Sequence, residues 1–385
     1  MTPTLWRLGQ LGLRARPHTR PGLHPCCASP SLGVLRVREK WDERNVSDGP
    51  IRAPRAQHAR PLGPGRSGYS AGVDVNRAPA PAVAVFAPVL LLHVELERDA
   101  DGAVEVHLHA GGQGYWVARM AAVLGAEAAL CAPVGGETGD VVSHLLAGEP
   151  VELRSVPFKG ANATFVHDRR EGERVALLEV APPALGRHDL DQLYNVTLAA
   201  ALESGACVLA GTQGSAVVDE RTYARLTRDL VSTGVPVVVD LSGDVLRAAL
   251  EGGPDLVKVS HEELLADGWA RAGTLDALVD AVTDLRAAGA RDVVVSRADA
   301  PTIACVGDEL VEVAAPRLCA LDHRGAGDSM TAALAVSVAR AVPLRDALAL
   351  AAAAGAVNVT RHGLASGYAA AIELLAARVR VSKIA

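Results

Sequence analysis

From residue 81 onward, hydrophobic and polar positions alternate in a way that predicts strands and helices in turn. Short runs rich in Val, Ile, Leu and Ala predict buried strands at 83–92, 128–134, 206–209, 235–240, 256–259, 292–296 and 302–306. Apolar residues at helical spacing predict helices at 111–124, 190–203, 220–233, 262–267, 275–288, 328–341 and 344–360. Strands that alternate with helices in this way predict an α/β fold with right-handed crossovers and a mostly parallel central sheet.

Two segments follow another pattern. Residues 104–109 alternate between apolar and polar side chains, as in a half-exposed strand, and 151–180 contains alternating runs broken by glycine-containing turns. We expect these segments to form hairpins, with strands from about 93–110 and 155–180. Together they would make a small β-sheet lid over the ligand-binding edge of the main sheet.

The first eighty residues are rich in Arg, Pro and Gly, contain few acidic residues and lack sustained periodicity. A basic, acid-poor start is compatible with a transit peptide, whereas the absence of a clean apolar core argues against a secretory signal. We favour a disordered extension, or one that results from an upstream start codon. The regular part of the chain, 81–385, is expected to form a single domain that carries the chemistry described below.

Composition excludes several classes of function. The formal net charge of −6 and the aromatic content of 3% argue against nucleic-acid binding, and no apolar run is long enough to cross a bilayer. The cysteines of the regular part occur singly in apolar segments, without the spacing of a zinc site. These features are typical of a cytoplasmic protein whose ligands are small molecules.

The segment Asp322-His323-Arg324-Gly325-Ala326-Gly327-Asp328-Ser329 contains the most informative motif. Its small residues allow a backbone turn to approach a ligand, and the residues that follow predict a buried helix. Free amide groups at a helix start can bind an anion. Asp328 could then accept a proton from a hydroxyl beside a bound phosphoryl group. An ordinary helix cap remains an alternative interpretation of Gly327 and Asp328, because Asp and Ser are favoured at that position.

Other polar residues also fall at or just after predicted strand ends: Asp240, Lys258, Ser260 and Ser296. Ligands of parallel sheets bind beyond the carboxyl ends of the strands, so these residues and the 322–328 segment are expected to share one site. With these motifs, the chain resembles the ribokinase-like (PfkB) carbohydrate kinases, closest to the branch of 1-phosphofructokinase and tagatose-6-phosphate kinase. The resemblance covers about 82–375 and implies a three-layer αβα sandwich.

The resemblance implies the following roles. Asp328 would be the catalytic base, and Gly325, Ala326 and Gly327 would form the anion hole. The residues implied in nucleotide binding are Lys258, Ser260, Glu263, Ser296, Asp322, Arg324, Gly355 and Asn358. Glu263 would also help to order Mg²⁺ through water. ATP and Mg²⁺ are therefore the expected cosubstrate and cofactor, and relatives often form homodimers through their lids.

For the acceptor, the resemblance implies Leu91, Gly111, Gly112, Gln113, Gly114, Trp116 and Arg119. Three departures bear on its identity. Leu91 stands where relatives have a sugar-binding Asp, and Gln113 and Trp116 replace polar groups used on the substrate. Ala163 stands where the phosphosugar branch has an Arg. We therefore expect a sugar or sugar-phosphate kinase, and keep as alternatives a kinase for a less polar alcohol such as a nucleoside, or a catalytically weak nucleotide or metabolite sensor.

Overall fold

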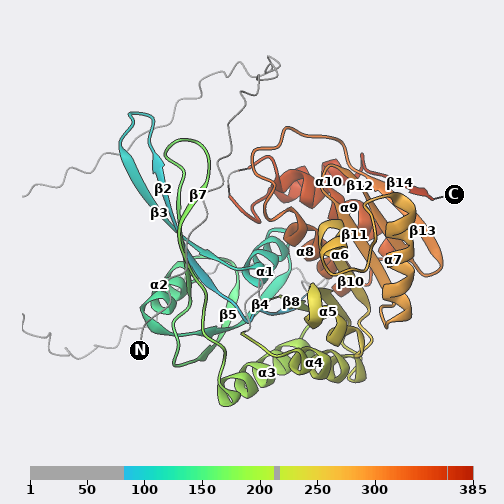
Figure 1. Cartoon of the computed structure of the whole chain (residues 1–385), viewed down its shortest axis with the longest axis horizontal. Helices are drawn as coiled ribbons and strands as arrows, with labels where there is room; N and C mark the ends of the chain where they lie inside the picture. Colours follow the sequence, from blue (N-terminus) through green and yellow to red (C-terminus); the bar gives the residue numbers. More distant parts are fainter. Residues whose placement is uncertain (1–81, 212–216, 362, 385) are drawn as a thin grey trace, which may run out of the picture. The chain divides into compact units, whose positions relative to one another are not determined.

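The computed structural model describes residues 82–211, 217–361 and 363–384 (Figure 1). The extension predicted for 1–80 lies outside the described residues. Within them, a ten-stranded sheet runs in the order β14-β13-β12-β11-β10-β9-β8-β1-β4-β5. Its strands are β1 (Ala82–Phe86), β4 (Glu127–Val134), β5 (Glu152–Pro157), β8 (Ala206–Ala210), β9 (Val237–Asp240), β10 (Leu256–Ser260), β11 (Asp292–Arg297), β12 (Ala300–Val306), β13 (Glu309–Ala314) and β14 (Arg380–Lys383).

The sheet is parallel from β5 to β11 and antiparallel from β11 to β14. Helices pack on both faces through two separate hydrophobic cores. One face carries α1 (Gln113–Val123), α8 (Ala326–Ala339), α9 (Leu344–Asn358) and α10 (Ala369–Ala376). The other carries α3 (Arg187–Leu202), α4 (Glu220–Ser232), α5 (Gly243–Leu250), α6 (His261–Ala266) and α7 (Leu275–Ala287). The predicted three-layer αβα sandwich is thus confirmed.

A separate four-stranded sheet, called here the small sheet, stands beside the large one in the order β3-β2-β6-β7 (Figure 1). It consists of β2 (Leu91–Arg98), β3 (Val104–Gly111), β6 (Ala163–Asp168) and β7 (Val175–Val180). Helix α2 (Gly136–Leu146) packs against the β2–β3 hairpin. No helix of the described residues is long and apolar enough to span a membrane.

Three element predictions need correction. The single strand predicted at 83–92 is two strands, because Pro88 interrupts the ladder and β2 leaves the large sheet for the small one. The segment at 155–157 belongs to β5, which pairs with β4 in the large sheet and not with the small sheet. The pattern also missed α2, α5, α10, β13 and β14, which are short or only partly buried.

The turn between β11 and β12 contains a strained residue. The φ of Ala298 is +48°, in the left-handed region that disfavours a Cβ atom. The strain energy relieved by glycine should be larger than the free-energy cost of the extra conformational entropy that glycine gives the unfolded chain. Ala298→Gly is therefore expected to raise the free energy of unfolding by about 0.5–1 kcal/mol. Urea denaturation measures this, with Ala277→Gly inside α7 as a destabilising control. An unchanged or lower midpoint for Ala298→Gly would contradict the prediction.

Candidate active site at the start of helix α8

The turn before α8 is shaped by its glycines and held by one asparagine. Gly325 has a φ of +74° and directly precedes the helix. Asn358 at the end of α9 donates from Nδ2 to the Arg324 carbonyl at 2.6 Å and accepts at Oδ1 from the Ala365 amide at 2.8 Å. Both ends of this side-chain amide are therefore used to hold the turn. The first amides of α8 remain available for an anion.

A buried ion pair lies directly against this turn. Asp240 ends β9 and Lys258 is its register partner on β10, so the two side chains meet, with Lys258 Nζ 3.3 Å from each Asp240 carboxylate oxygen. They are 2% and 5% exposed. A Cβ atom on Gly327 would lie 2.6 Å from Lys258 Nζ, so only glycine admits the ammonium this close to the turn. Although burial works in the opposite direction, Asp240 and Asp328 raise the pKa of Lys258, and it stays charged.

Thr331 links this pair to α8. Its hydroxyl lies 2.5 Å from Asp240 Oδ2 and 3.1 Å from the Gly327 carbonyl, one turn before it. Sequence reasoning noted Asp240 only as a residue at a strand end and did not recognise Thr331. The pairing of Asp240 with Lys258 could have been found, because neighbouring parallel strands bring their carboxyl ends together.

Asp328 is half-buried and has access to a cleft. It lies in the first turn of α8 and lines a cleft of about 1040 Å³, together with Asp240 and Glu263. Burial, followed by the negative charge of Asp240, raises the pKa of Asp328 to about 7, while Lys258 acts in the opposite direction. A carboxylate with a pKa near neutrality is well matched to proton transfer at neutral pH.

The predicted nucleotide residues on β10 and β11 lie side by side. Ser260 and Ser296 are register partners at the ends of the two strands. Ser260 caps α6 and forms a capping box with Glu263, whose Oε2 accepts from the Ser260 amide at 2.8 Å and hydroxyl at 2.7 Å. This box was recognisable from the spacing Ser-x-x-Glu but was not predicted. It fixes the Glu263 carboxylate at the edge of the cleft.

The other predicted nucleotide residues have different surroundings. The Asp322 carboxylate accepts from Arg324 Nε at 3.0 Å and from Arg169 Nη2, on the loop after β6, at 3.0 Å. Although burial acts in the opposite direction, these hydrogen bonds hold the pKa of Asp322 well below its usual range. Gly355 allows α9 to approach α8, since a Cβ there would lie 2.9 Å from Met330. Asp322, Gly355 and Asn358 thus shape the turn from inside the protein, and their role in nucleotide binding stays a prediction.

The predicted acceptor residues are divided among three environments. Leu91 is fully buried, and Gly111, Gly112 and Gly114 pack closely on the β1–β2 connection or on β2. A Cβ on Gly112, for example, would lie 2.4 Å from the Val89 carbonyl oxygen. Leu91 and the three glycines therefore shape the site through packing and backbone, and their role in acceptor binding stays a prediction.

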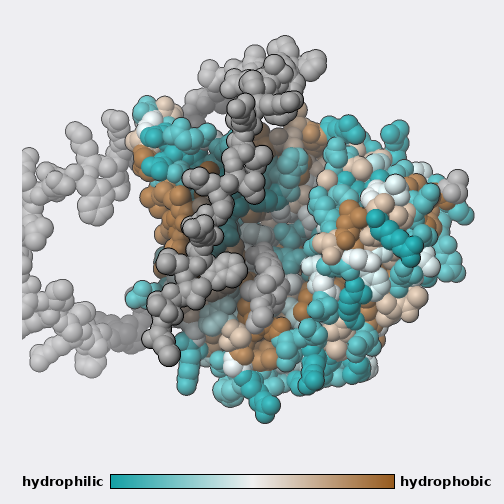
Figure 2. Space-filling model, in the orientation of Figure 1, coloured by the Kyte–Doolittle hydropathy of each residue, from teal (hydrophilic) through white to brown (hydrophobic). Residues whose placement is uncertain are grey.

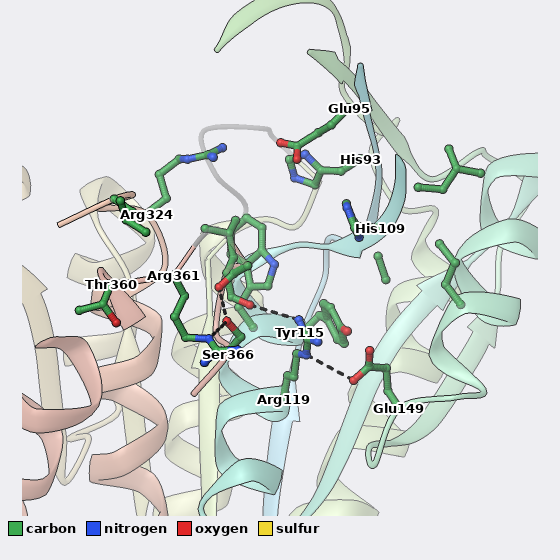
Figure 3. A pocket seen from close by; sticks show the side chains of 17 residues that line it. His93, Glu95, His109, Tyr115, Arg119, Glu149, Arg324, Thr360, Arg361 and Ser366 are labelled. Carbon is green, nitrogen blue, oxygen red and sulfur yellow. Dashed lines mark hydrogen bonds and ion pairs between the residues drawn. The ribbon is translucent and has the colours of Figure 1, made fainter. Parts of the chain in front are cut away.

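Gln113, Trp116 and Arg119 face two different cavities. Gln113 lines the cleft of Asp328, where its side-chain amide donates to the Asp240 carbonyl at 3.2 Å and accepts from the Gly211 amide at 2.7 Å. Trp116 and Arg119 line a second cavity of about 660 Å³, which also includes Arg324 (Figure 3). The two cavities have no lining residue in common. Arg324 in the turn before α8 lines the second cavity, and Asp328 in the first turn of α8 lines the cleft.

The cleft fits a metal that is bound mainly by a nucleotide. No group of three or more metal-ligating side chains is assembled for an ion in the described part of the chain. Mg²⁺ commonly keeps several waters and is held by one or two carboxylates together with substrate phosphates. Glu263 and Asp240, both on the cleft, provide such carboxylates without forming a complete protein site.

Comparisons with known proteins agree with this geometry. The profile of the pfkB family carbohydrate kinases matches residues 89–370. The ATP-dependent 6-phosphofructokinase isozyme 2 of Escherichia coli is 31% identical over 257 residues, which cover 66% of this chain and 82% of that protein. The 1-phosphofructokinase of Bacillus subtilis is 24% identical over 278 residues, or 71% and 88% of the two chains.

Solved structures show the same fold. The Escherichia coli phosphofructokinase-2 in complex with potassium superposes with a TM-score of 0.68 at 24% identity and covers 78% of this chain and 99% of its own. Arabidopsis thaliana ribokinase, complexed with ribose and ATP, gives a TM-score of 0.61 at 18% identity, with 77% and 99% covered. The chain belongs to the pfkB family of carbohydrate kinases and is a sugar or sugar-phosphate kinase.

Proposed function

We propose that the protein transfers the γ-phosphoryl group of ATP to a hydroxyl of a sugar or sugar phosphate, with Asp328 as the base and the Gly325–Asp328 turn as the anion hole. The observation that carries this proposal is the position of Asp328. Its carboxylate faces the cleft from the first turn of α8, next to the free amides of that helix. A proton acceptor and an anion site are thus formed by the same few residues.

The turn supplies positive electrostatic potential where negative charge accumulates. In phosphoryl transfer, catalysis depends mainly on positioning and on neutralising the charge of the transferring oxygens. The amides of Ala326, Gly327 and Asp328 start a helix and carry the positive end of its dipole. The Lys258 ammonium adds a full charge against Gly327. Each such preorganised donor typically contributes about 3 kcal/mol to transition-state stabilisation.

The remaining nucleotide contacts are assigned to the ends of β10 and β11. Ser260 and Ser296 lie together there, and Glu263 is fixed beside them by the capping box. Bound Mg²⁺ neutralises phosphate charge, and the Glu263 carboxylate would hold it through water. Arg324 is assigned to ligand binding on the side of the second cavity, which it lines.

The pH dependence of the reaction provides one test. Because burial and Asp240 raise the pKa of Asp328 to about 7, despite the opposing charge of Lys258, the base is protonated below that pH. We expect kcat/KM for the acceptor to fall about tenfold per pH unit below about 7 and to be constant above it. Asp240→Asn removes a like charge, so the fall in kcat/KM should begin at a lower pH in this variant. A fall that begins at the same pH in Asp240→Asn would argue against Asp328 as the titrating group.

The acceptor is identified by turnover. ATP consumption is measured with a panel of free hexoses, hexose phosphates and nucleosides, with Asp328→Ala as the control. Turnover with a sugar or sugar phosphate supports the proposed function, and turnover confined to nucleosides supports the less polar alternative suggested by Trp116. ATP binding without turnover on any acceptor would indicate a sensor.

We also propose that the protein forms a homodimer through the small sheet. Its outer face carries an apolar row across all four strands, in which Val94 pairs with Leu108 and Val166, and Val166 pairs with Leu178. Leu108 and Leu178 are 44% and 52% exposed, and Figure 2 shows hydrophobic residues gathered over this part of the protein. Exposed apolar patches of this kind commonly mark protein interfaces. A similar protein, the Escherichia coli phosphofructokinase-2, has been solved in a tetrameric inhibited form.

This proposal predicts a change of mass in solution. Leu178→Asp places a charge in the middle of the apolar row and is expected to convert the dimer to a monomer in light scattering coupled to size exclusion. Leu374→Asp is the matched control, because Leu374 on α10 is 65% exposed and far from the small sheet in sequence and topology. A wild-type protein that is monomeric at micromolar concentration would refute the dimer.

A further inference from the structure

A side chain from a loop of the small sheet reaches the turn before α8. Arg169 lies on the loop between β6 and β7, and its Nη2 donates to Asp322 Oδ2 at 3.0 Å. The two residues are 153 positions apart in the sequence, and their side chains are only 16% and 11% exposed. Hydrogen bonds between two ionised groups are stronger than neutral ones, and shielding from water strengthens them further. This contact can therefore influence the conformation of the turn.

The small sheet holds Arg169 in place. The Arg169 amide donates to the Leu96 carbonyl of β2 at 2.8 Å, and its Nε lies 3.5 Å from Glu95 Oε1 on the same strand. The guanidinium group thus lies between a carboxylate of the small sheet and the Asp322 carboxylate of the turn. Figure 3 shows the Arg324 side chain extending from the turn toward Glu95, which lines the same cavity.

Asp322 connects this contact to the anion-hole turn. Its Oδ1 accepts from the backbone amide of Arg324 at 3.0 Å and from Arg324 Nε at 3.0 Å. Gly325, with its φ of +74°, follows directly, and Ala326 is the first residue of α8. A rotation of the Asp322 carboxylate would therefore move the backbone immediately before the amides that are assigned to the anion hole.

The turn is also held from the side of α9. The Val359 carbonyl accepts from the amides of Leu321 and Asp322 at 2.7 and 3.2 Å, and the Asn358 side chain holds the turn as described above. These contacts do not depend on the small sheet. We therefore expect that loss of the Arg169 guanidinium would loosen the turn without unfolding it.

We propose that Arg169 is a positioning residue for phosphoryl transfer, which acts through Asp322 to fix the turn that carries the anion hole. The proposal rests on the proposed function, which assigns this role to the Gly325–Asp328 turn. Preorganised donors stabilise a transition state only at the correct distance, and a displacement of about 1 Å can lower a rate about a hundredfold. Because the contacts from α9 remain, a smaller loss, on the order of tenfold in kcat, is expected without Arg169.

The first test needs no turnover. Hydrogen exchange of the ligand-free protein, followed by mass spectrometry, measures local opening of the segment 320–329, where the amides of Leu321, Asp322 and Arg324 are hydrogen-bonded. Arg169→Gln should speed exchange of this segment on the order of tenfold, the usual effect of one lost charge-assisted hydrogen bond. Exchange in the later turns of α8 should not change.

The matched control is the next residue on the same loop. Arg170 donates from Nε and Nη2 to the Asp168 carboxylate, at 2.9 and 2.6 Å, so its guanidinium is bound within its own loop region. Arg170→Gln removes the same charge from the same loop as Arg169→Gln. Its exchange over 320–329 and its turnover should equal those of the wild type.

Kinetics then separate a positioning role from direct ligand contact. With ATP and the acceptor that the wild type phosphorylates, Arg169→Gln should lower kcat about tenfold and change the KM of either substrate less than about threefold. Arg169→Lys keeps the charge and one donor to the carboxylate, so it should recover part of kcat and of the protection from exchange. In Asp322→Asn protein, Arg169→Gln should cause no further loss, because Arg169 acts through that carboxylate.

The outcomes are separable. Unchanged exchange over 320–329 in Arg169→Gln overturns the inference, and so does an equal increase in Arg170→Gln. A defect confined to the KM of the acceptor also overturns it, because Arg169 would then bind that ligand directly. If Arg169→Gln does not fold, as judged by circular dichroism, Arg169→Lys is used for both measurements. A wild-type protein without kinase turnover would refute the proposed function, and hydrogen exchange alone would then decide whether Arg169 fixes the turn.

Discussion

Replacement of Asp328 by Asn is expected to lower kcat on the order of 10²–10⁴-fold, the usual contribution of a general base. The amide keeps the shape of the carboxylate but cannot accept the proton of the acceptor hydroxyl. The anion-hole amides and Lys258 remain, so residual activity and ATP binding should persist. The measurement is steady-state turnover at saturating ATP and acceptor, at a pH above the pKa of Asp328.

The structure also predicts what this substitution does to stability. The folded-state pKa of Asp328 is raised from 3.8 to about 7 by burial and Asp240, against the charge of Lys258, so the carboxylate that predominates above that pH is less stable in the native protein than in the unfolded chain. Any stability gained from the neutral form is lost as pH rises through about 7. At pH 8, Asp328→Asn should therefore be at least as stable as the wild type. A loss of rate accompanied by an unchanged Tm would identify a chemical and not a folding defect.

The matched control for Asp328 is Asp276, which also lies in the first turn of a helix, α7, but is exposed to solvent. Both carboxylates interact with a helix dipole, so Asp276→Asn removes the same charge–dipole interaction at a position outside the cleft. Its turnover should equal that of the wild type. An equal loss in both variants, or full activity of Asp328→Asn, would reject Asp328 as the base.

Local sequence patterns were sufficient for most of the large sheet. The strands at 206–209, 256–259 and 292–296 are nearly continuous apolar runs, as expected for strands buried on both faces, and the structure places them within one residue. The pattern failed at 83–92, where an apolar run continues across Pro88 into another sheet. Periodicity indicates burial, but it does not show which sheet a strand joins.

The candidate site shows the same limit. The Gly-Ala-Gly-Asp segment and the strand-end residues could be recognised one by one, because each has a local signature. The partner of Asp322 could not, since Arg169 is distant in sequence, lies on the loop after a strand of the other sheet and meets it only in the folded chain. The resemblance implied that both Gln113 and Trp116 bind the acceptor, but in the structure they line different cavities. Their short separation in the sequence does not show this.

The largest expected effect on stability comes from Asp240. Asp240→Ala leaves Lys258 charged, buried and without its partner, and breaking a buried ion pair in this way typically costs about 3–5 kcal/mol. It also removes an acceptor of the Thr331 hydroxyl. We expect a decrease in Tm on the order of 10 °C, measured by calorimetry, together with a loss of activity.

A double variant separates the two roles of the pair. Asp240→Val with Lys258→Met replaces the buried charges by apolar side chains of similar size, an exchange that is often neutral or stabilising. Stability should therefore largely return, whereas activity should not, because the turn has lost the ammonium that lies against Gly327. If the double variant regained both stability and turnover, Lys258 would have only a structural role. If it stayed as unstable as Asp240→Ala, the cost would arise from lost packing around β9 and β10 and not from the unpaired charge.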